Sequence, residues 1–319
     1  MSVNRGKVVI IGTSNVGSAV LNKITDFQLA SEIALIDLDM DRARGEALDT
    51  SHAMSSPYST NIKVHTGTYE DCRDAAFIVI TAGPSILPGE TPDRLKLAST
   101  NTKIMRSIFS EIVKYTKEAM IIMITNPLDV ATYVVSTEFD YPREKILGTG
   151  TMLETYRFRY ILAEHYDMDP KNIHGYVLGE HGNDAFVAWS TVNCAGLGID
   201  HLDEYFHFEE KLSRQEVEQG LIQTAYDVIN LKGFTNTGIA MVACRFIKAI
   251  LYNEHTILPC AAVMNGEYGM RDVALSIPRM ISQDGIVRSL EVHLPEDEME
   301  KLVRAQKSVR AALDGAGVK

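Results

Sequence analysis

The start of the chain constrains its fold more than any other segment. After Lys7, residues 8–11 are all apolar, Gly12 follows, and a helical pattern occupies residues 19–24. An apolar run without polar alternation predicts a strand that is buried on both faces, as in a parallel sheet. A buried strand that passes through a glycine turn into a helix is the first part of a βαβ unit.

The same alternation of strands and helices continues to about residue 150. Buried strands are predicted at residues 33–37 and 119–125, further strands near residues 62–66 and 75–81, and helices at residues 42–54 and 94–117. Residues 83–92 hold three prolines and two glycines, which predicts a loop. Short strands that alternate with helices predict right-handed crossovers and a doubly wound parallel sheet, the Rossmann fold.

Beyond residue 150 the pattern changes. Helices are predicted at residues 153–166, 212–231, 239–251 and 296–313, and strands near residues 257–264 and 273–281. We therefore expect a Rossmann domain over residues 1–148 and an α/β (α+β) catalytic domain over residues 149–319. No linker composition separates the two, so they should pack tightly around a cleft.

Composition excludes several classes of partner. The formal net charge is −11, whereas nucleic acids and anionic membranes bind basic surfaces. No apolar run approaches the roughly 20 residues of a spanning helix, and the N-terminus lacks the form of a signal peptide. The cysteines have no metal-binding spacing, and isolated thiols are typical of a reducing cytoplasm; they are Cys72, Cys194, Cys244 and Cys260. We expect a cytoplasmic protein without a metal site.

The first turn resembles a dinucleotide-binding fingerprint. Gly12, Ser14 and Gly17 occupy the three glycine positions of G-x-G-x-x-G, with serine at the second. Asp37 lies twenty residues past Gly17, at the end of the next predicted strand. An acid there binds a ribose diol and repels a 2′-phosphate, which favours NAD over NADP. The alternative is an ordinary strand–helix turn with a capping acid.

A histidine between two glycines marks a second site. Residues 176–183 read Tyr-Val-Leu-Gly-Glu-His-Gly-Asn, so an apolar strand end runs into His181. Glycine on both sides permits a sharp turn and the close approach of a ligand, and histidine transfers a proton readily near neutral pH. The alternative is a turn with a surface histidine.

Glu154 and Arg157 are three residues apart on a predicted helix and therefore share a face. Arginine can hold a carboxylate with two parallel hydrogen bonds, and a carboxylate beside a histidine fixes its tautomer and favours the imidazolium. The alternative is a solvated salt bridge on the helix surface.

Four stretches together resemble the L-2-hydroxy acid dehydrogenases, the lactate/malate dehydrogenase family. They are residues 81–83 leading to 89–95, residues 125–127, residues 148–159 and the Gly-Glu-His-Gly turn at 179–182. The resemblance extends to about residue 280 and is closest to the L-lactate dehydrogenases and their relatives for larger 2-hydroxy acids. It implies an NAD-dependent, cytoplasmic enzyme of fermentation and glycolysis that forms a homotetramer or a dimer.

The resemblance also implies roles for individual residues. His181 is the proton donor, and Arg157 clamps the substrate carboxylate. Glu154 stands where the family has an aspartate that holds the histidine. Arg94 polarises the ketone when the preceding loop closes, and Asn126 hydrogen-bonds near the reacting carbonyl.

Further positions follow from the same resemblance. Thr235 lines the substrate pocket, and Ile239 backs the nicotinamide ring. The remaining cofactor positions are Asn15, Val16, Thr81, Ala82 and Gly83. Arg159 and His174 resemble the fructose 1,6-bisphosphate site of allosteric bacterial lactate dehydrogenases.

Ile86 takes the position that faces the C3 end of the substrate, where malate dehydrogenases have arginine and lactate dehydrogenases have glutamine. An apolar residue does not compensate a second carboxylate, so oxaloacetate should be a poor substrate. Three alternatives stay open: an L-2-hydroxyisocaproate dehydrogenase-like enzyme for bulky 2-oxo acids, a malate dehydrogenase, and a dinucleotide-binding protein without catalytic activity.

Overall fold

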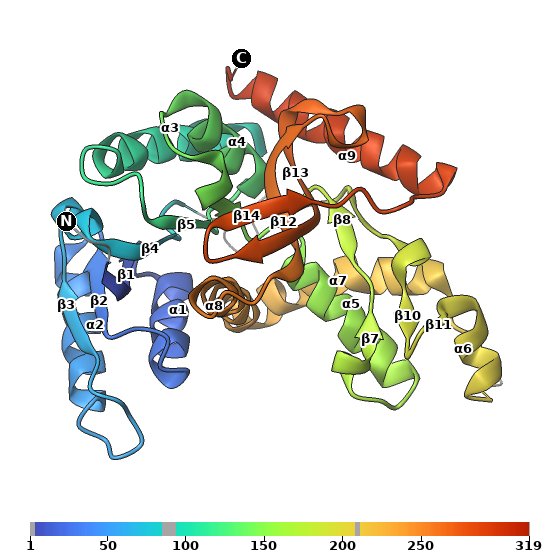
Figure 1. The fold of residues 1–319 in the computed structure, drawn as a ribbon, viewed down its shortest axis with the longest axis horizontal. Coiled ribbons are helices and arrows are strands. Elements are labelled where there is room, and N and C mark those ends of the chain that lie inside the picture. Colours follow the sequence, from blue (N-terminus) through green and yellow to red (C-terminus); the bar gives the residue numbers. More distant parts are fainter. Residues whose placement is uncertain (1–3, 85–93, 208–210, 319) are drawn as a thin grey trace.

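The computed structural model of the chain describes residues 4–84, 94–207 and 211–318. The parallel strands of the first half are β1 (Asn4–Ile11), β2 (Glu32–Ile36), β3 (Lys63–Thr66), β4 (Ala75–Ile80), β5 (Met120–Met123) and β6 (Ile146–Gly148). They lie in the order β3-β2-β1-β4-β5-β6 (Figure 1). This is the strand order of the Rossmann fold, so the predicted doubly wound parallel sheet is confirmed.

Helices cover both faces of this sheet because its strands are apolar on both sides. Val8 and Ile10 pack against α1 (Asn15–Asp26), α2 (Met40–Ala53) and α8 (Thr237–Leu251). Val9 and Ile11 point to the opposite face and pack against α3 (Arg94–Ile112) and α4 (Leu128–Glu138). Successive side chains of a strand alternate between faces, so one apolar run supplies two hydrophobic cores.

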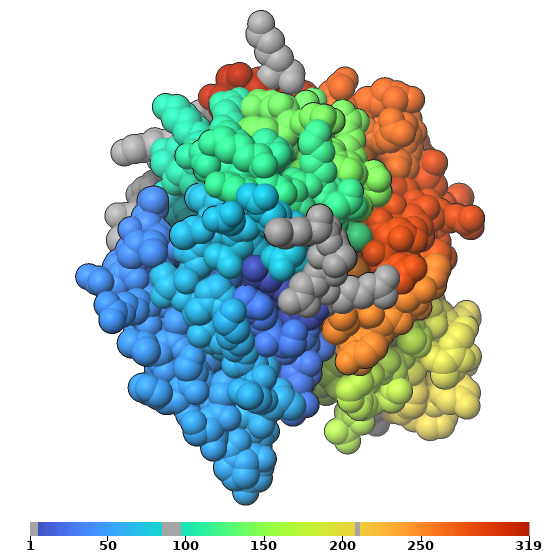
Figure 2. Space-filling model, turned by 60° about the vertical axis from the view of Figure 1, so that its left-hand side comes forward, coloured from blue at the N-terminus to red at the C-terminus, as the bar shows by residue number. Residues whose placement is uncertain are grey.

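The second half of the chain extends the same sheet. Its strands are β12 (Thr256–Asn265), β13 (Arg271–Ser282), β8 (Val177–Gly179), β9 (Ala185–Val187) and β14 (Gly285–Ser289). The order continues as β6-β12-β13-β8-β9, and β12 is antiparallel to β6. The two halves are therefore joined by backbone hydrogen bonds, and Figure 2 shows orange residues of the second half directly beside blue residues of the first.

The remaining elements lie around this extension. Helix α9 (Glu296–Gly315) packs on β13, and α5 (Met152–His165) packs against α7 (Arg214–Lys232) and α8. A small sheet contains β7 (Ile173–His174), β10 (Asn193–Cys194) and β11 (Leu197–Gly198), next to α6 (Ile199–Tyr205). In the described part of the chain no single helix is long and apolar enough to cross a membrane; α7 and α8 pass that test only as a pair bent by 117°.

Most of the predicted elements are present, and the differences have physical causes. Helix α4 was not predicted, because its residues from Leu128 to Ser136 are all buried and so show no helical alternation. Helix α3 ends at Ile112 rather than near residue 117, since the N–H groups of Lys114 and Tyr115 bond to carbonyls three residues back. Gly233 ends α7 with a φ of 90°, as its position predicted.

Candidate active site

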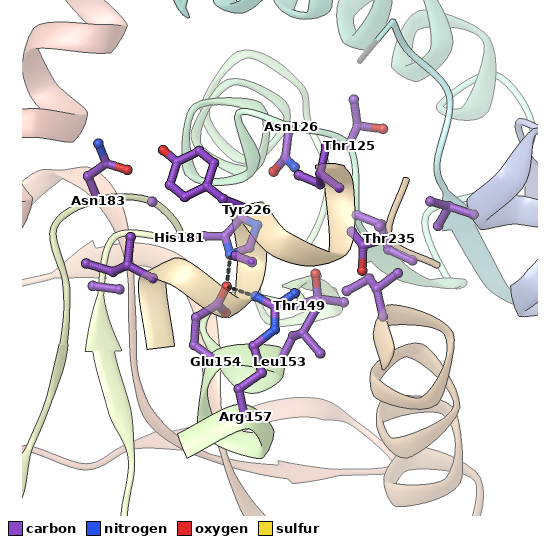
Figure 3. A pocket seen from close by; sticks show the side chains of 18 of the residues that line it. Thr125, Asn126, Thr149, Leu153, Glu154, Arg157, His181, Asn183, Tyr226 and Thr235 are labelled. Carbon is purple, nitrogen blue, oxygen red and sulfur yellow. Dashed lines mark ion pairs between the residues drawn. The ribbon is translucent and has the colours of Figure 1, made fainter. Parts of the chain in front are cut away.

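A pocket of about 360 Å³ lies where the two halves of the chain meet. Its walls come from the ends of β4, β5 and β8 and from α5, α7 and the start of α8. In open α/β sheets this carboxyl edge of the strands is where ligands bind. Figure 3 shows His181, Glu154 and Arg157 grouped in this pocket, with Asn126 and Thr235 on its other sides.

His181 is held by its turn and by two carboxylates. Gly179, at the end of β8, has a φ of 93°, a conformation that favours glycine. The Nδ1 atom of His181 lies 3.2 Å from Oε1 of Glu154. The backbone N–H of His181 donates to Oδ2 of Asp129 at 2.7 Å. Burial opposes the charged ring, but these carboxylates outweigh it and raise the pKa of His181 to about 9. The imidazole is therefore charged at neutral pH. Its side chain is 22% exposed and faces the pocket.

Glu154 and Arg157 form the floor of the same cluster. Arg157 Nη1 lies 3.6 Å from Glu154 Oε1, and the two side chains are 14% and 12% exposed. Burial opposes the charge of Glu154, yet His181 and Arg157 lower the pKa of this carboxyl. A pair this buried is not a solvated surface salt bridge. The glutamate, although one methylene longer than aspartate, reaches the histidine directly.

Two threonine hydroxyls bond to the backbone of β8; they fix α5 relative to β8, and so fix Glu154 relative to His181. The Thr151 hydroxyl donates to the carbonyl of Val177 at 2.5 Å, and the N–H of Val177 donates to the Thr155 hydroxyl at 3.0 Å. Thr151 and Thr155 are fully buried, where each lost hydrogen bond is costly. The acid–histidine distance is thus set by the packing of a helix on a strand.

Asn126 enters the pocket from the first half of the chain. It follows β5, and its backbone carbonyl accepts from Nδ2 of Asn101 at 2.5 Å. Thr125 beside it donates to the carbonyl of Ala82 at 2.8 Å, which ties the ends of β4 and β5 together. The Asn126 side chain is exposed to the pocket.

The glycine turn fits a dinucleotide. A Cβ atom at Gly17 would lie 1.9 Å from the carbonyl oxygen of Gly12, and Gly12 has a φ of 99°. Glycine is therefore required at both positions for the close approach of β1 and α1. Ser14 is exposed, and its side chain makes no capping hydrogen bond. The N-terminus of α1 and the Ser14 hydroxyl thus lie where a dinucleotide-binding fold places the pyrophosphate.

Asp37 is bonded to this turn. Its Oδ2 accepts from the N–H of Thr13 at 2.6 Å and from the Thr13 hydroxyl at 2.9 Å. Burial opposes its charge, but the N–H groups of Thr13 and Asp39 and the charge of Arg42 lower the pKa of Asp37. Asp37 is thus a fixed anion beside the turn. Thr13 was missed by sequence reasoning because it lies between fingerprint positions.

The structure brings most of the other predicted positions together. Val16, Thr81, Gly83, Thr235 and Ile239 line the pocket. Thr81 also donates from its hydroxyl to the carbonyl of Gly12 at 2.8 Å. Ala82 is half-buried next to this contact. Asn15 borders a different hollow between α1 and α2.

Other predicted positions lie apart or outside the described residues. Arg159 lines a separate hollow beside Tyr156 and Lys171, and Nη2 of Arg159 donates to the carbonyl of Gly175 at 3.2 Å. His174 is exposed on β7. Ile86 and the side chain of Arg94 lie outside the described residues.

Sequence reasoning missed one whole wall of the pocket. Helix α7 supplies a stripe of mainly apolar side chains: Leu221, Ile222, Ala225, Tyr226 and Ile229. Their spacing is that of one helical face, a signal that was present in the sequence. It was not assigned to a site because apolar stripes usually mark a core.

Comparison with known proteins agrees with this geometry. Residues 6–148 match the family model described as "lactate/malate dehydrogenase, NAD binding domain", and residues 151–317 match "lactate/malate dehydrogenase, alpha/beta C-terminal domain". An L-lactate dehydrogenase of Selenomonas ruminantium is 75% identical over 316 residues, which cover 99% of each chain. L-lactate dehydrogenase 2 of Clostridium acetobutylicum is 48% identical, over 99% of this chain and 98% of that protein.

Solved structures show the same relationship. The minor L-lactate dehydrogenase from Enterococcus mundtii, in a ligand-bound form, has a TM-score of 0.91 and 35% identity over 97% of both chains. A lactate dehydrogenase from a deep-sea metagenome library has a TM-score of 0.91 and 31% identity, over 99% of this chain and 100% of that one. The chain belongs to the lactate/malate dehydrogenase family and is an NAD-dependent oxidoreductase.

Proposed function

We propose that the chain catalyses the reversible reduction of pyruvate by NADH to L-lactate. One observation carries the proposal: a partly buried histidine with a raised pKa, its carboxylate partner and an arginine meet in one pocket beside a glycine turn of the dinucleotide-binding type. The relatives that match nearly the full chain are named L-lactate dehydrogenases. Activity on pyruvate is therefore the first expectation to test.

The residues of the pocket divide the work of the reaction. Arg157 binds the substrate carboxylate through its guanidinium fork. His181 donates its proton to the carbonyl oxygen as the alkoxide develops, and Glu154 holds the ring in place and stabilises its charge. Asn126 donates a hydrogen bond near the same carbonyl, and we assign the polarising role to Arg94.

The cofactor site follows from the fit of the glycine turn. Gly12, Ser14 and Gly17 would hold the pyrophosphate at the start of α1, and Asp37 would bind the ribose diol. NADH, when bound, supplies the hydride that the carbonyl carbon accepts. Thr235 and Ile239 would hold the reacting end of the cofactor against the substrate.

The described pocket favours a monocarboxylate. Among the described residues that line it, the cationic side chains are Arg157 and His181. Both have roles with the 2-oxo acid group itself, and the α7 wall is mainly apolar. A second carboxylate against this wall is desolvated without a partner, which costs several kcal/mol. We therefore expect poor activity with oxaloacetate, and activity with 2-oxo acids that carry longer apolar side chains.

A panel of substrates tests the proposal. The decrease in NADH absorbance would be followed with pyruvate, 2-oxoisocaproate, phenylpyruvate and oxaloacetate. His181→Gln should abolish activity with all of them. His65→Gln is the matched control, because His65 also pairs with a glutamate, Glu32, at 2.9 Å but lies on β3, at the outer edge of the sheet, and does not line the pocket. Oxaloacetate reduced as efficiently as pyruvate would contradict the substrate assignment, and full activity of His181→Gln would contradict the mechanism.

We also propose the domain boundary between residues 148 and 149, a cytoplasmic location and a homotetramer. Sedimentation velocity tests the homotetramer.

Fructose 1,6-bisphosphate is proposed as an effector that binds near Arg159 and His174. In support, Arg159 is largely buried, and its Nε atom makes no hydrogen bond to the described residues. Activity assays of the native chain and of Arg159→Gln, each with and without fructose 1,6-bisphosphate, test the effector site.

A further inference from the structure

Asp129 contacts the turn that carries His181, although the two residues come from different halves of the chain. Its Oδ2 accepts the His181 backbone N–H at 2.7 Å. Asp129 is 3% exposed and lies in the first turn of α4, directly after Asn126 and Pro127. The segment that carries Asn126 is thereby tied to the histidine turn on the opposite wall of the pocket.

A buried acid at this place needs an explanation, because a neutral acceptor would make the same bond without the cost of burying a charge. The Oδ1 atom of Asp129 is buried and makes no hydrogen bond within the described residues. Glu298 is a useful contrast. It is equally buried and also accepts a backbone N–H, that of Ser190, but its second oxygen accepts the Ser190 hydroxyl. Both carboxylate oxygens of Glu298 therefore accept local hydrogen bonds, whereas only one oxygen of Asp129 accepts a hydrogen bond from the described residues.

We propose that Asp129 is a positioning residue for His181, which fixes the histidine turn from α4 and keeps the imidazole protonated through a second negative charge. The inference rests on the proposed role of His181 as the proton donor. Glu154 contacts the ring from α5, whereas Asp129 binds the backbone N–H of His181 from α4 and acts on the ring through its charge. Two carboxylates from different helices therefore act on His181.

The charges around the pair agree with this arrangement. Burial raises the pKa of Asp129 to about 7, and the neighbouring His181 charge opposes that rise. The other charged groups that act on the pair, from α5, the histidine turn and β13, are Glu154, Arg157, Glu180 and Arg279. Above about pH 7 Asp129 is ionised, so its charge supports the imidazolium in the alkaline range where the histidine loses its proton.

Asp129→Asn tests the proposal, because asparagine keeps an acceptor for the His181 N–H and removes the charge by placing an NH2 group at the Oδ1 position, where the native carboxylate makes no hydrogen bond within the described residues. The pH at which kcat/KM for pyruvate reduction falls should move down by roughly half to one unit. The ring titration of His181, followed by NMR and assigned with His181→Gln, should move by the same amount. Glu298→Gln, the matched control, should leave both curves unchanged.

Several outcomes would overturn the inference. One is a pH profile of kcat/KM for Asp129→Asn that coincides with the native profile. Another is a loss of kcat/KM by the same factor at every pH with an unshifted ring titration, because it would leave Asp129 a structural contact only. Asp129→Ala also removes the acceptor and should be less active than Asp129→Asn at all pH values. If Asp129→Ala does not fold, the pH profile and ring titration of Asp129→Asn still test the inference. Full activity of His181→Gln would refute the proposed function instead, and the ring titration would still report on Asp129.

Discussion

Replacing Glu154 by glutamine should make the reduction of 2-oxo acids strongly dependent on pH. The carboxylate lies 3.2 Å from His181 Nδ1 and is the strongest of the charges that raise the histidine pKa from 6.5 to about 9. That rise corresponds to about 3 kcal/mol in favour of the imidazolium. In Glu154→Gln, burial opposes the remaining charge of Asp129, and we expect the pKa of His181 to return to about its ordinary value. At pH 8 the protonated fraction then falls from about nine-tenths to a few hundredths.

The expected loss in kcat/KM for pyruvate is therefore about 30-fold at pH 8 and less than about 2-fold at pH 6, apart from a constant factor for orientation. Steady-state rates with saturating NADH between pH 5.5 and 9.5 measure it. Glu154→Asp is the matched control, because it keeps the charge and should keep the native shape of the profile. A Glu154→Gln profile parallel to the native one at every pH would refute the reasoning, since it would mean that Glu154 does not set the protonation of His181.

Three other predictions follow from the structure. Arg157→Lys keeps the charge but loses the fork, so kcat/KM for pyruvate should fall by at least about 100-fold, while NADH binding by fluorescence stays unchanged; near-native turnover would place the substrate carboxylate elsewhere. The native chain should prefer NADH to NADPH by roughly 100-fold in kcat/KM, and Asp37→Ser should narrow that ratio; equal use of both cofactors by the native chain would exclude the role of Asp37. The raised pKa of His181 contributes stability that is complete below about pH 6.5 and lost as the pH rises through about 9. The free energy of unfolding, measured with urea, should decline over this pH range in the native chain and less in His181→Gln. The same dependence on pH in both proteins would exclude the contribution of His181.

The Rossmann half of the fold was predictable because its central strands, β1, β4 and β5, contain unbroken apolar runs. The residues of β1 face two cores at once, and this pattern has few other solutions. The second half was harder, since β8 and β9 are only three residues long and owe their existence to pairing with distant strands. Pairing over such separations leaves little trace in local sequence. Helix α4 was invisible for the opposite reason, that it is buried all round.

The catalytic cluster was predictable because it consists of ionisable side chains, whose burial costs free energy. Glu154, Arg157 and His181 meet as expected, and the pair proved buried rather than solvated. Asp129 escaped notice because the helix that carries it, α4, was not predicted from the sequence. Its contact with His181 spans 52 positions of sequence, and only the folded sheet brings them together.

The joining of β6 to β12 has a mechanical consequence. Asn126 follows β5 and His181 follows β8, and strand pairing through β6, β12 and β13 connects those two strands. The spacing between Asn126 and His181 is therefore set by one continuous sheet and not by a linker between two separate lobes. Helix α7 has no such attachment, and few of its residues are buried. Variation in substrate range should therefore accumulate on that one helix, where it can change the shape of the pocket without disturbing the reaction geometry.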